Sequence, residues 1–565
     1  MEIRKQLVDT KKPHAMLVKW VTVSAVIGII TGLSVSLLEL AVLDTFDLVL
    51  SFFKLHPFLM LIIPTISLGI VGLMRDKLTK RPSLHGTEEV LDAYHYQEGE
   101  LPLQDVPVKI AGSILTIGAG GSAGLEGPSI HIGGAVGYAV KKIMDKLNMD
   151  GNARLLLLTG AASGIGAIFK APLTGLMFAL EVPYKDDMAH QAVVPALISS
   201  VVSYITLITV LGAEPIFKHF KTYRELDLIL IGQSLVEGVL IGIMAFIFVK
   251  LTSIVESLME GRSYWLRGLL GGLSVGILGL LSLYTYGGVY PLGLSYEVVK
   301  MSFEGGDPHF FLGLAFLKML TTAFTLGSAG IGGVFIPSIV IGSALGSAFS
   351  SINPEGRSLF VAIGMSSFLS AAFKTPLASV TFVAETTGSE AYIIPGLIAS
   401  AVSYIVTGKY SLPKNQRFVE VTTLEELEKI LVGKIMTPPP PIVDANITLK
   451  EFMRRHFLKE HKYSTFPVKA SNGRLIGVIT VNDVDSVPTE EWDRRKVIDV
   501  LRKVEFLRPN ESVLSALDKF YEYGIHCLPV VDPIKEEVVG ALSTDDVVRY
   551  LEHRRMLKKT TLFFR

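Results

Sequence analysis

Long apolar segments dominate the chain up to about Tyr410, and they restrict the available folds more than any other feature. A run of about 20 apolar residues is long enough to cross the hydrocarbon core of a bilayer as a helix. Of the 565 residues, 49% are hydrophobic and only 19% are charged, which is too apolar for a soluble protein of this size. The sequence therefore predicts an all-α polytopic membrane protein with apolar segments at residues 17–42, 58–74, 155–180, 228–249, 268–283 and 393–406.

Charge and cysteine content exclude several other classes of protein. The formal net charge is +0, so no polybasic surface for nucleic acid is indicated. The single cysteine, Cys527, excludes an internal disulfide framework and a cysteine metal cluster. The apolar run after the basic start is long enough to remain as a span, so we expect no cleaved signal peptide. By the positive-inside rule, the N-terminus is predicted to be cytoplasmic from Arg4, Lys5, Lys11 and Lys12.

Acidic and basic residues become frequent beyond Tyr410, which predicts a soluble domain after the membrane part. We expect a membrane domain over residues 1–410, a linker over 411–430 and a soluble domain over 431–565. The linker region is basic, so the soluble domain is predicted on the same cytoplasmic side of the plasma membrane. The residues behind this last prediction are Lys409, Lys414 and Arg417.

The membrane part repeats itself. "GSAG" at 121–124 returns at 327–330, an offset of 206 residues, and "FKAPLTGLMFALE" returns as "FKTPLASVTFVAE", an offset of 204 from Phe169 to Phe373. Two matches at nearly one offset indicate a duplicated unit, predicted over about 17–213 and 228–407. Transporters are often built from such halves, with the binding site where interrupted helices meet at the midplane. The relative orientation of the halves is left open by these matches.

The soluble part also repeats. "STFPVKASNGRLIGVITVNDV" from Ser464 pairs with "HCLPVVDPIKEEVVGALSTDDV" from His526. Each copy reads as a strand, a polar turn, a second strand and a helix, preceded by an amphipathic helix that opens with Asn. The sequence predicts a small α/β pair with copies at 431–497 and 498–565.

The phrase "GSAGLEGPSIHIGG" predicts an anion site within the membrane. Glycine and small residues permit close backbone approach, and Pro128 suits the first turn of a helix that begins at about Gly127. The free amides and the dipole of such a helix start attract an anion. The later phrase "GIGGVFIPSI" predicts a second helix start, with Pro337 in the matching role, and the two starts are expected to converge on one point.

Glu126 is a carboxylate in this apolar setting and needs an explanation. An ionisable side chain at membrane depth is costly and is by default a functional candidate. Ionised, Glu126 would occupy the amides, and protonated or displaced it would leave room for a mobile anion. The alternatives are a glutamate at a solvent-filled loop tip and a structural pair with Lys109.

The residues around Glu126 resemble the CLC family of chloride channels and transporters. "GLEGP" at 124–128 looks like its G-R/K-E-G-P signature, "GVFIP" at 333–337 fits G-x-F-x-P, and Lys109 stands 17 residues before Glu126 as the family lysine does. The C-terminal repeats resemble a tandem CBS module. The resemblance implies an inverted-repeat CLC fold with a cytoplasmic α/β tandem CBS domain. It also implies a homodimer with one anion pathway per subunit, and a gate formed by Glu126.

The resemblance also assigns the anion-binding groups. The external site would use backbone amides of Leu125, Glu126, Gly127, Phe335 and Ile336, and the central site those of Val334 and Phe335. Lys109 would contribute to the electrostatics of the pore. Leu125 stands where the family usually has a basic residue, so the entrance is expected to be less positive.

Two side-chain ligands of the family are harder to match. "SLHGTEEV" stands in for the G-S-G-x-P loop and puts His85 at the serine position, with Ser83 or Thr87 as alternatives after a local shift. A polar loop residue facing water explains the same stretch. Tyr410 is the candidate for the central tyrosine, although alignment through Ser411 puts a proline there and an exposed linker tyrosine is the alternative.

The residue after Glu181 bears on the mode of transport. Many proton-coupled family members have two successive glutamates here, whereas this chain has Val182, which has no titratable group. We therefore expect a chloride-selective channel with passive anion flow, and proton–chloride exchange is the alternative. Glu181 and Glu385 are interpreted as structural acids at helix ends, with Lys170 and Lys374 as their counterparts or as part of the entrance field.

The CBS resemblance implies a possible adenine nucleotide (ATP, ADP or AMP) near Thr480, Asp483, Ser543 and Asp546, and helix capping explains the same four residues. No other cofactor is expected, and no phosphate-binding loop of the hydrolase type is present. A CBS-regulated divalent-cation transporter would need several converging acids, which the repeat junction does not offer. No nucleophile–base pair or metal spacing indicates an enzyme.

Overall fold

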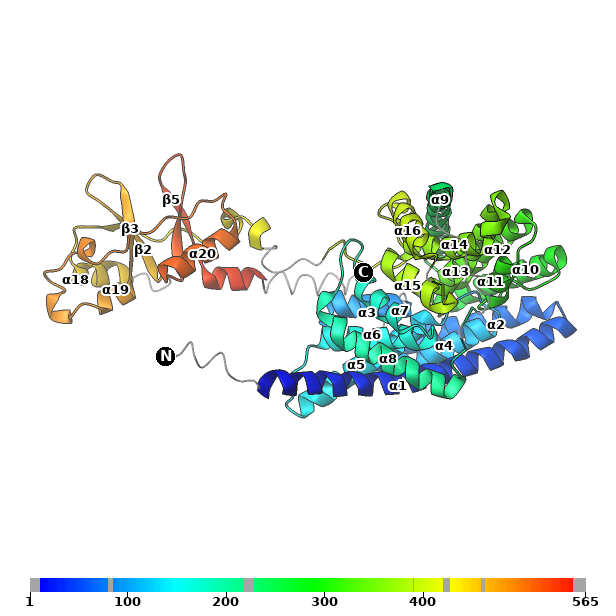
Figure 1. The fold of residues 1–565 in the computed structure, drawn as a ribbon. Coiled ribbons are helices and arrows are strands. Elements are labelled where there is room, and N and C mark those ends of the chain that lie inside the picture. Colours follow the sequence, from blue (N-terminus) through cyan, green and yellow to red (C-terminus); the bar gives the residue numbers. More distant parts are fainter. Residues whose placement is uncertain are drawn as a thin grey trace. The chain divides into compact units, whose positions relative to one another are not determined.

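In the computed structural model the chain forms two compact units, residues 1–420 and 421–565, which are described separately. The structure describes residues 11–79, 85–214, 216–217, 228–389, 391–419, 427–458 and 463–551. The first unit is helical, and the strands lie in the second (Figure 1).

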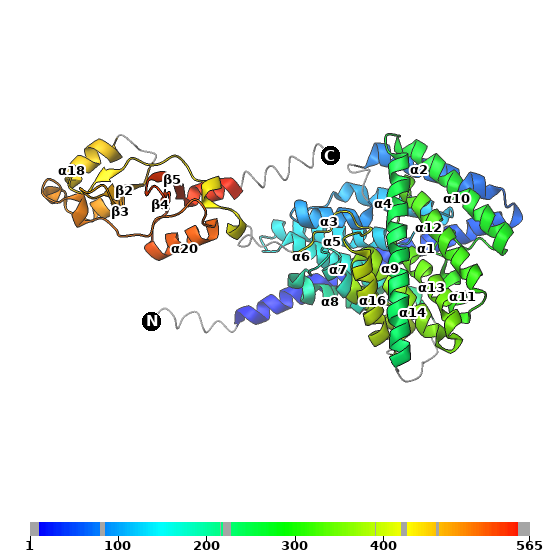
Figure 2. The same ribbon diagram turned by 90° about the horizontal axis from the view of Figure 1, so that it is seen from above.

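The first unit contains two successive sets of helices, seen in blue to cyan and in green to yellow in Figures 1 and 2. The first set is α1 (Lys11–Leu55), α2 (Leu59–Leu78), α3 (Gly86–Tyr96), α4 (Val106–Gly118), α5 (Glu126–Lys146), α6 (Ala153–Ile168), α7 (Pro172–Glu181) and α8 (Val193–Leu211). The second set is α9 (Leu228–Met259), α10 (Tyr264–Tyr286), α11 (Tyr296–Glu304), α12 (Pro308–Ser328), α13 (Phe335–Phe349), α14 (Arg357–Phe373), α15 (Pro376–Thr387) and α16 (Ile393–Thr407).

Many of these helices suit a membrane. Among the described residues, eight helical segments are long and apolar enough to cross a bilayer, and α6 and α16 are shorter apolar helices. Large apolar side chains also face outward, as with Leu37 at 68% and Ile247 at 43% exposure, which suits contact with lipid. The predicted all-α polytopic architecture is confirmed.

The helices of the two sets pack in corresponding pairs. α1 lies along α8 as α9 lies along α16, and α5 packs on α6 as α13 packs on α14. Small residues allow this close contact: a Cβ added to Gly133 would lie 1.9 Å from the carbonyl oxygen of Gly160, and one added to Gly342 would lie 2.3 Å from that of Gly364.

The structure corrects the offset of the repeats around Glu126. The amide of Gly121 donates to the carbonyl of Thr116, and the amide of Gly330 donates to that of Thr325, so Gly121 corresponds to Gly330 at an offset of 209. The two "GSAG" phrases, 206 residues apart, therefore do not occupy equivalent positions. Glycine-rich turns favour the same few residue types, and this one produced a false match three residues out of register.

The second unit has the predicted α/β repeats. β1 (Val443–Asp444), β2 (Thr465–Lys469) and β3 (Leu475–Thr480) form one sheet, and β4 (Cys527–Val531) and β5 (Val538–Ser543) form the other. β2–β3 and β4–β5 are antiparallel hairpins with matching register irregularities, while β1 pairs parallel with β2. Its helices include α18 (Leu449–Phe452), α19 (Val481–Asp485) and α20 (Val513–Tyr523).

The start of the predicted linker is bound to the first unit. The amide of Leu412 donates to the carbonyl of Ala372, and Gln416 Nε2 donates to the carbonyls of Val182 (3.0 Å) and Phe373 (2.7 Å). The division between the units accordingly follows residue 420. Residues 420–426, within the predicted linker, lie outside the described residues.

We expect Gly133→Ala to destabilise the membrane unit, because the new methyl group would collide with the backbone of α6. Overpacking of this kind typically costs about 1–3 kcal/mol. The measurement is the thermal unfolding midpoint of the full chain in detergent. Gly232→Ala is the matched control, since nothing lies within 4 Å of its added Cβ. Equal midpoints for the two variants would contradict the packing argument.

Candidate functional site

Two helix starts meet at the centre of the first unit. Gly124 and Gly333 exchange two backbone hydrogen bonds of 2.8 Å each, just before α5 and α13 begin. The N-cap residues are Leu125 and Val334, so the first amides of both helices face a common space. We call this space the cradle. A Cβ at Gly124 or Gly333 would lie 2.0 Å from a carboxylate oxygen of Glu126, so glycine at both positions leaves room for that carboxylate.

Glu126 lies in the cradle and is fully buried. Its Oε1 accepts a hydrogen bond from the amide of Phe335, and the amides of Ile336 and of Glu126 itself also face the carboxylate. Oε2 has no hydrogen-bond partner among the described residues. Of the residues assigned to anion binding, the structure thus brings Phe335 and Ile336 to the carboxylate, and it places Leu125, Gly127 and Val334 at the same two helix starts.

A third helix start adjoins the cradle. α3 begins at Gly86, whose added Cβ would lie 2.1 Å from the carbonyl oxygen of Gly127. His85 is the N-cap of α3, and its Nδ1 is buried without a hydrogen-bond partner among the described residues. Thr87 is buried in the same turn, whereas Ser83 lies outside the described residues.

Aromatic side chains enclose the α13 side of the cradle. The ring centroid of Phe335 lies 4.4 Å from that of Phe169, with the rings tilted, and 4.9 Å from that of Phe382, in an edge-to-face contact. Tyr296 lies close enough to Glu126 and Glu39 for their charges to act on its phenol. The sequence analysis did not assign Phe169, Phe382 or Tyr296 to the site, because they come from helices distant in the chain and follow no local motif.

Lys109 belongs to a buried cluster with two residues that the sequence analysis also missed. Its Nζ lies 2.9 Å from Oε1 of Glu89, and Oε2 of Glu89 lies 2.8 Å from Nδ1 of His131. All three side chains are buried at 2% exposure or less. The alternative in which Lys109 pairs with Glu126 is wrong, because Lys109 pairs with Glu89.

Glu181 and Glu385 each bind the start of a helix in the opposite half. Glu181 accepts from the amides of Leu377 (3.0 Å) and Ala378 (2.7 Å) at the start of α15. Glu385 accepts from the amides of Leu173 (2.8 Å) and Thr174 (2.7 Å) at the start of α7. These contacts agree with the interpretation of both as structural acids at helix ends.

The prediction that Lys170 and Lys374 pair with these acids is wrong. Lys170 donates to the carbonyls of Gly212 and Glu214, and Lys374 donates to the carbonyl of Tyr404 at 2.8 Å. Both lysines have positive φ, at 50° and 61°, at the turns that precede α7 and α15. Their ammonium groups therefore bind backbone carbonyls, whereas the acids bind helix amides.

Tyr410 and Val182 lie away from the cradle contacts. Tyr410 is 37% exposed and packs under the ammonium of Lys250 and beside Phe246, both on α9. Val182 is buried at 3% exposure, at the end of α7.

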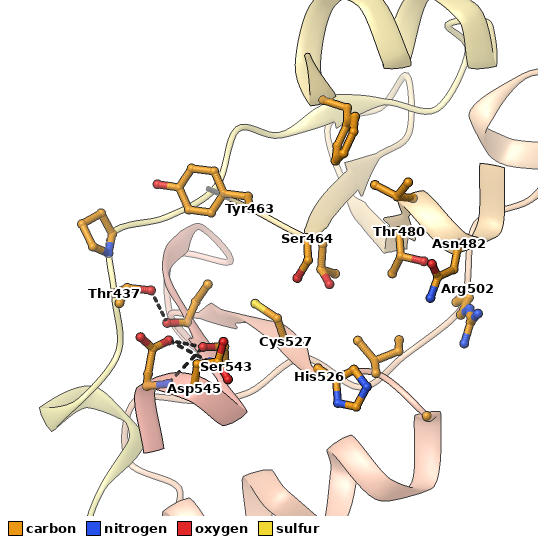
Figure 3. Close-up of a pocket in the computed structure, with 18 of the residues that line it drawn as sticks. Thr437, Tyr463, Ser464, Thr480, Asn482, Arg502, His526, Cys527, Ser543 and Asp545 are labelled. Atoms are coloured by element: carbon orange, nitrogen blue, oxygen red, sulfur yellow. Dashed lines mark hydrogen bonds between the residues drawn. The ribbon is translucent and has the colours of Figure 1, made fainter. Parts of the chain in front are cut away.

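The second unit has a cavity of about 730 Å³ between its two repeats (Figure 3). Thr480 and Ser543 line it from the ends of β3 and β5, together with Arg502 and Cys527. Asp483 caps the helix start at Thr480 and pairs with Arg502 at 2.5 Å. Asp546 accepts from the amide and the hydroxyl of Ser543, at 3.0 Å and 2.6 Å. The capping alternative therefore accounts for the contacts of all four predicted residues.

An amide cradle filled by a carboxylate, built from two helix starts in a polytopic unit, defines a membrane protein of the anion-transporting class. The family model described as "Voltage gated chloride channel" matches residues 70–408, and the CBS domain model matches residues 432–488 and 497–553. The chain belongs to this family, the CLC chloride channels and transporters, and carries a C-terminal tandem CBS module.

Individual relatives agree with this assignment. The chain is 26% identical to an uncharacterised protein of Methanocaldococcus jannaschii over 72% of this chain and 97% of that protein. It is 30% identical to the H(+)/Cl(-) exchange transporter ClcA of Vibrio cholerae, over 52% of this chain and 64% of the transporter, so it spans less than two thirds of that relative. The crystal structure of a CLC-type fluoride/proton antiporter matches with a TM-score of 0.64 at 24% identity, over 72% of this chain and 98% of the antiporter, and it supports the fold.

Cys527 gives a test of the cavity in the second unit. Burial raises the pKa of its thiol to about 12, and the charge of Asp546 acts in the same direction. Since the thiolate is the reactive form, we expect maleimide labelling of the folded chain at pH 8 to be at least about 100-fold slower than that of the urea-unfolded chain. Equal labelling rates at pH 8 would contradict the buried setting.

Proposed function

We propose that this protein transports chloride through the cradle, where Glu126 and chloride take turns on the same amides. The observation that carries the proposal is the contact between the buried carboxylate and the first amides of α13. Those amides have no helical partner, and they are oriented to bind any anion that reaches them. A carboxylate on them stands in the place of chloride.

Protonation would release the site. When Glu126 takes up a proton its charge is neutralised, so its attraction for the amides falls and chloride can replace it. When the carboxyl loses that proton, the carboxylate competes with chloride again. Lys109 lies in the buried cluster near this path, where its positive charge is balanced by Glu89. The amides of Leu125, Gly127 and Val334, and the side chain of His85, are the remaining proposed ligands.

For the mode of transport we propose proton–chloride exchange. The carboxyl in the cradle binds either the amides or a proton, which is the property a coupled exchanger needs, and the matched relative from Vibrio cholerae is named as an exchange transporter. A passive channel is the second candidate, because Val182 carries no titratable group where many proton-coupled members have an acid.

We expect Glu126→Gln to give chloride flux that no longer depends on pH and moves no protons. Glutamine keeps the shape of the side chain but neither gains nor loses a proton, so the alternation between gate and chloride is lost. The measurement is chloride and proton flux from liposomes containing the purified protein. Glu237→Gln in α9 is the matched control, since Glu237 is also fully buried and should leave the pH response unchanged. An unaltered pH response in Glu126→Gln would refute the gate.

The reversal potential separates the two modes. In liposomes with a chloride gradient and a superimposed pH gradient, an exchanger shows a reversal potential that shifts with the pH gradient, because protons carry part of the current. A channel shows a potential set by chloride alone. We expect the shift, and a potential independent of pH would establish the passive mode instead.

We also propose a homodimer in the plasma membrane, with its N-terminus and CBS domain in the cytoplasm. The proposed ligand of the CBS cavity is an adenine nucleotide that regulates transport. The volume of the cavity suits a nucleotide. Arg502 and Arg549 line the cavity and can pair with phosphate.

If a nucleotide binds there, Arg502→Ala should weaken its affinity by about tenfold, because a charge-assisted contact is lost. Calorimetry of the full chain with ATP, ADP and AMP measures this. Arg495→Ala is the control, since Arg495 forms an exposed pair with Glu491 and does not line the cavity. The absence of heat with all three nucleotides would argue against the ligand class.

A further inference from the structure

His131 is a buried titratable side chain on the helix that begins at the gate. It lies five residues after Glu126 on α5, which corresponds to about 7.5 Å along the helix axis. The ring is fully buried, and its Nε2 has no hydrogen-bond partner among the described residues. A buried polar nitrogen without a partner is costly, so its retention here needs a function.

The nearness of Glu89 favours one tautomer of the ring. Nδ1 lies 2.8 Å from the carboxylate of Glu89, so we assign the proton of the neutral ring to Nδ1. In the neutral ring Nε2 is then the basic nitrogen, free to accept a proton. The same carboxylate stabilises the imidazolium once Nε2 is protonated.

The charged groups on the helices packed against α5 do not replace His131 as a proton acceptor. From α3 the facing group is Glu89, and from α4 it is Lys109, which pairs with the same carboxylate at 2.9 Å. Arg75 of α2 acts on Glu89 from further away. The titratable side chain of α6 is Arg154 in its exposed first turn, and on α1 the charge of Glu39 acts on Tyr296.

The cluster of Lys109, Glu89 and His131 lies between the cradle and the side of the membrane proposed as cytoplasmic. α5 runs from Glu126 towards a loop in which the carbonyl of Asp150 accepts from Lys19, near the start of α1. α3 runs from the cradle to His95, whose Nε2 lies 2.7 Å from the carbonyl of Pro183, directly after Val182. Glu89 therefore lies on a helix that connects the gate with the turn where the second acid is missing, and His131 lies on α5, which packs against that helix.

We propose that His131, oriented by Glu89, is the inner proton-binding residue of transport, in place of the titratable group absent at Val182. The proton leaves the carboxyl of Glu126 through an intervening water molecule and binds Nε2 of His131. Glu126 becomes a carboxylate and His131 an imidazolium, so charge and atoms balance. The imidazolium then loses the proton to water on the cytoplasmic side. This proposal rests on proton–chloride exchange as the proposed function.

The test compares His131→Gln with the unchanged chain in liposomes, with chloride and proton fluxes measured together. We expect the number of protons moved per chloride to fall by at least about tenfold, because the acceptor is lost, while chloride flux stays within about twofold. Glu237→Gln is the control, as a second buried titratable group outside this cluster, and should keep the coupling. Glu89→Gln retains the imidazole and should reduce coupling partially, which provides a readout if His131→Gln does not fold.

The outcomes distinguish failure of the proposed role of His131 from failure of the proposed exchange. Proton flux that persists at an unchanged ratio in both His131→Gln and Glu89→Gln would overturn the role of His131 and leave exchange intact. Loss of coupling in Glu237→Gln as well would also overturn it. If the unchanged chain moves chloride without protons, the proposed exchange itself is refuted, and the inner proton site with it.

Discussion

The double hydrogen bond between Gly124 and Gly333 is the contact on which the cradle depends, because it holds two interrupted helices start to start. In hydrocarbon, backbone groups outside a helix must find partners, and an unpaired group costs several kcal/mol. The two glycines satisfy each other and leave the first amides of α5 and α13 facing one space. These amides and the dipoles of the two helices favour an anion in that space, and the carboxyl group of Glu126 occupies it.

Two other glutamates of the membrane unit also bind helix starts, and their contacts differ from those of Glu126. Glu181 and Glu385 each bind the start of a helix in the opposite half, and both of their oxygens accept backbone amides. Thr174 adds a hydroxyl donor at 2.6 Å to Glu385. Glu126 also reaches into the opposite half, but its Oε2 has no hydrogen-bond partner among the described residues. The first two carboxylates therefore join the halves through both oxygens, whereas the unpartnered Oε2 of the third agrees with the proposed exchange of Glu126 for chloride.

The sequence was informative where a local rule applies and misleading where it does not. Pro128 and Pro337 mark helix starts because proline suits the first turn, and both helices begin within two residues of them. The glycine phrase gave an offset three residues out, since any tight turn favours the same residues. Glu89 and His131 were missed because they are 42 positions apart in the chain and meet only after α3 packs on α5.

In the proposed exchange, the cluster of Lys109, Glu89 and His131 would link proton binding to chloride binding. With a neutral imidazole, Lys109 and Glu89 cancel each other, so the cluster adds no net charge near the cradle. With a proton on His131 the cluster becomes positive, which favours an anion on the amides nearby. By thermodynamic reciprocity, an anion on the amides then favours the proton to the same extent. A carboxyl at position 182 would also gain one unit of positive charge on protonation, so the two residue types differ in their absolute charge and not in the direction of this coupling. A histidine in the proposed position would make the protonated cluster and the occupied cradle stabilise each other.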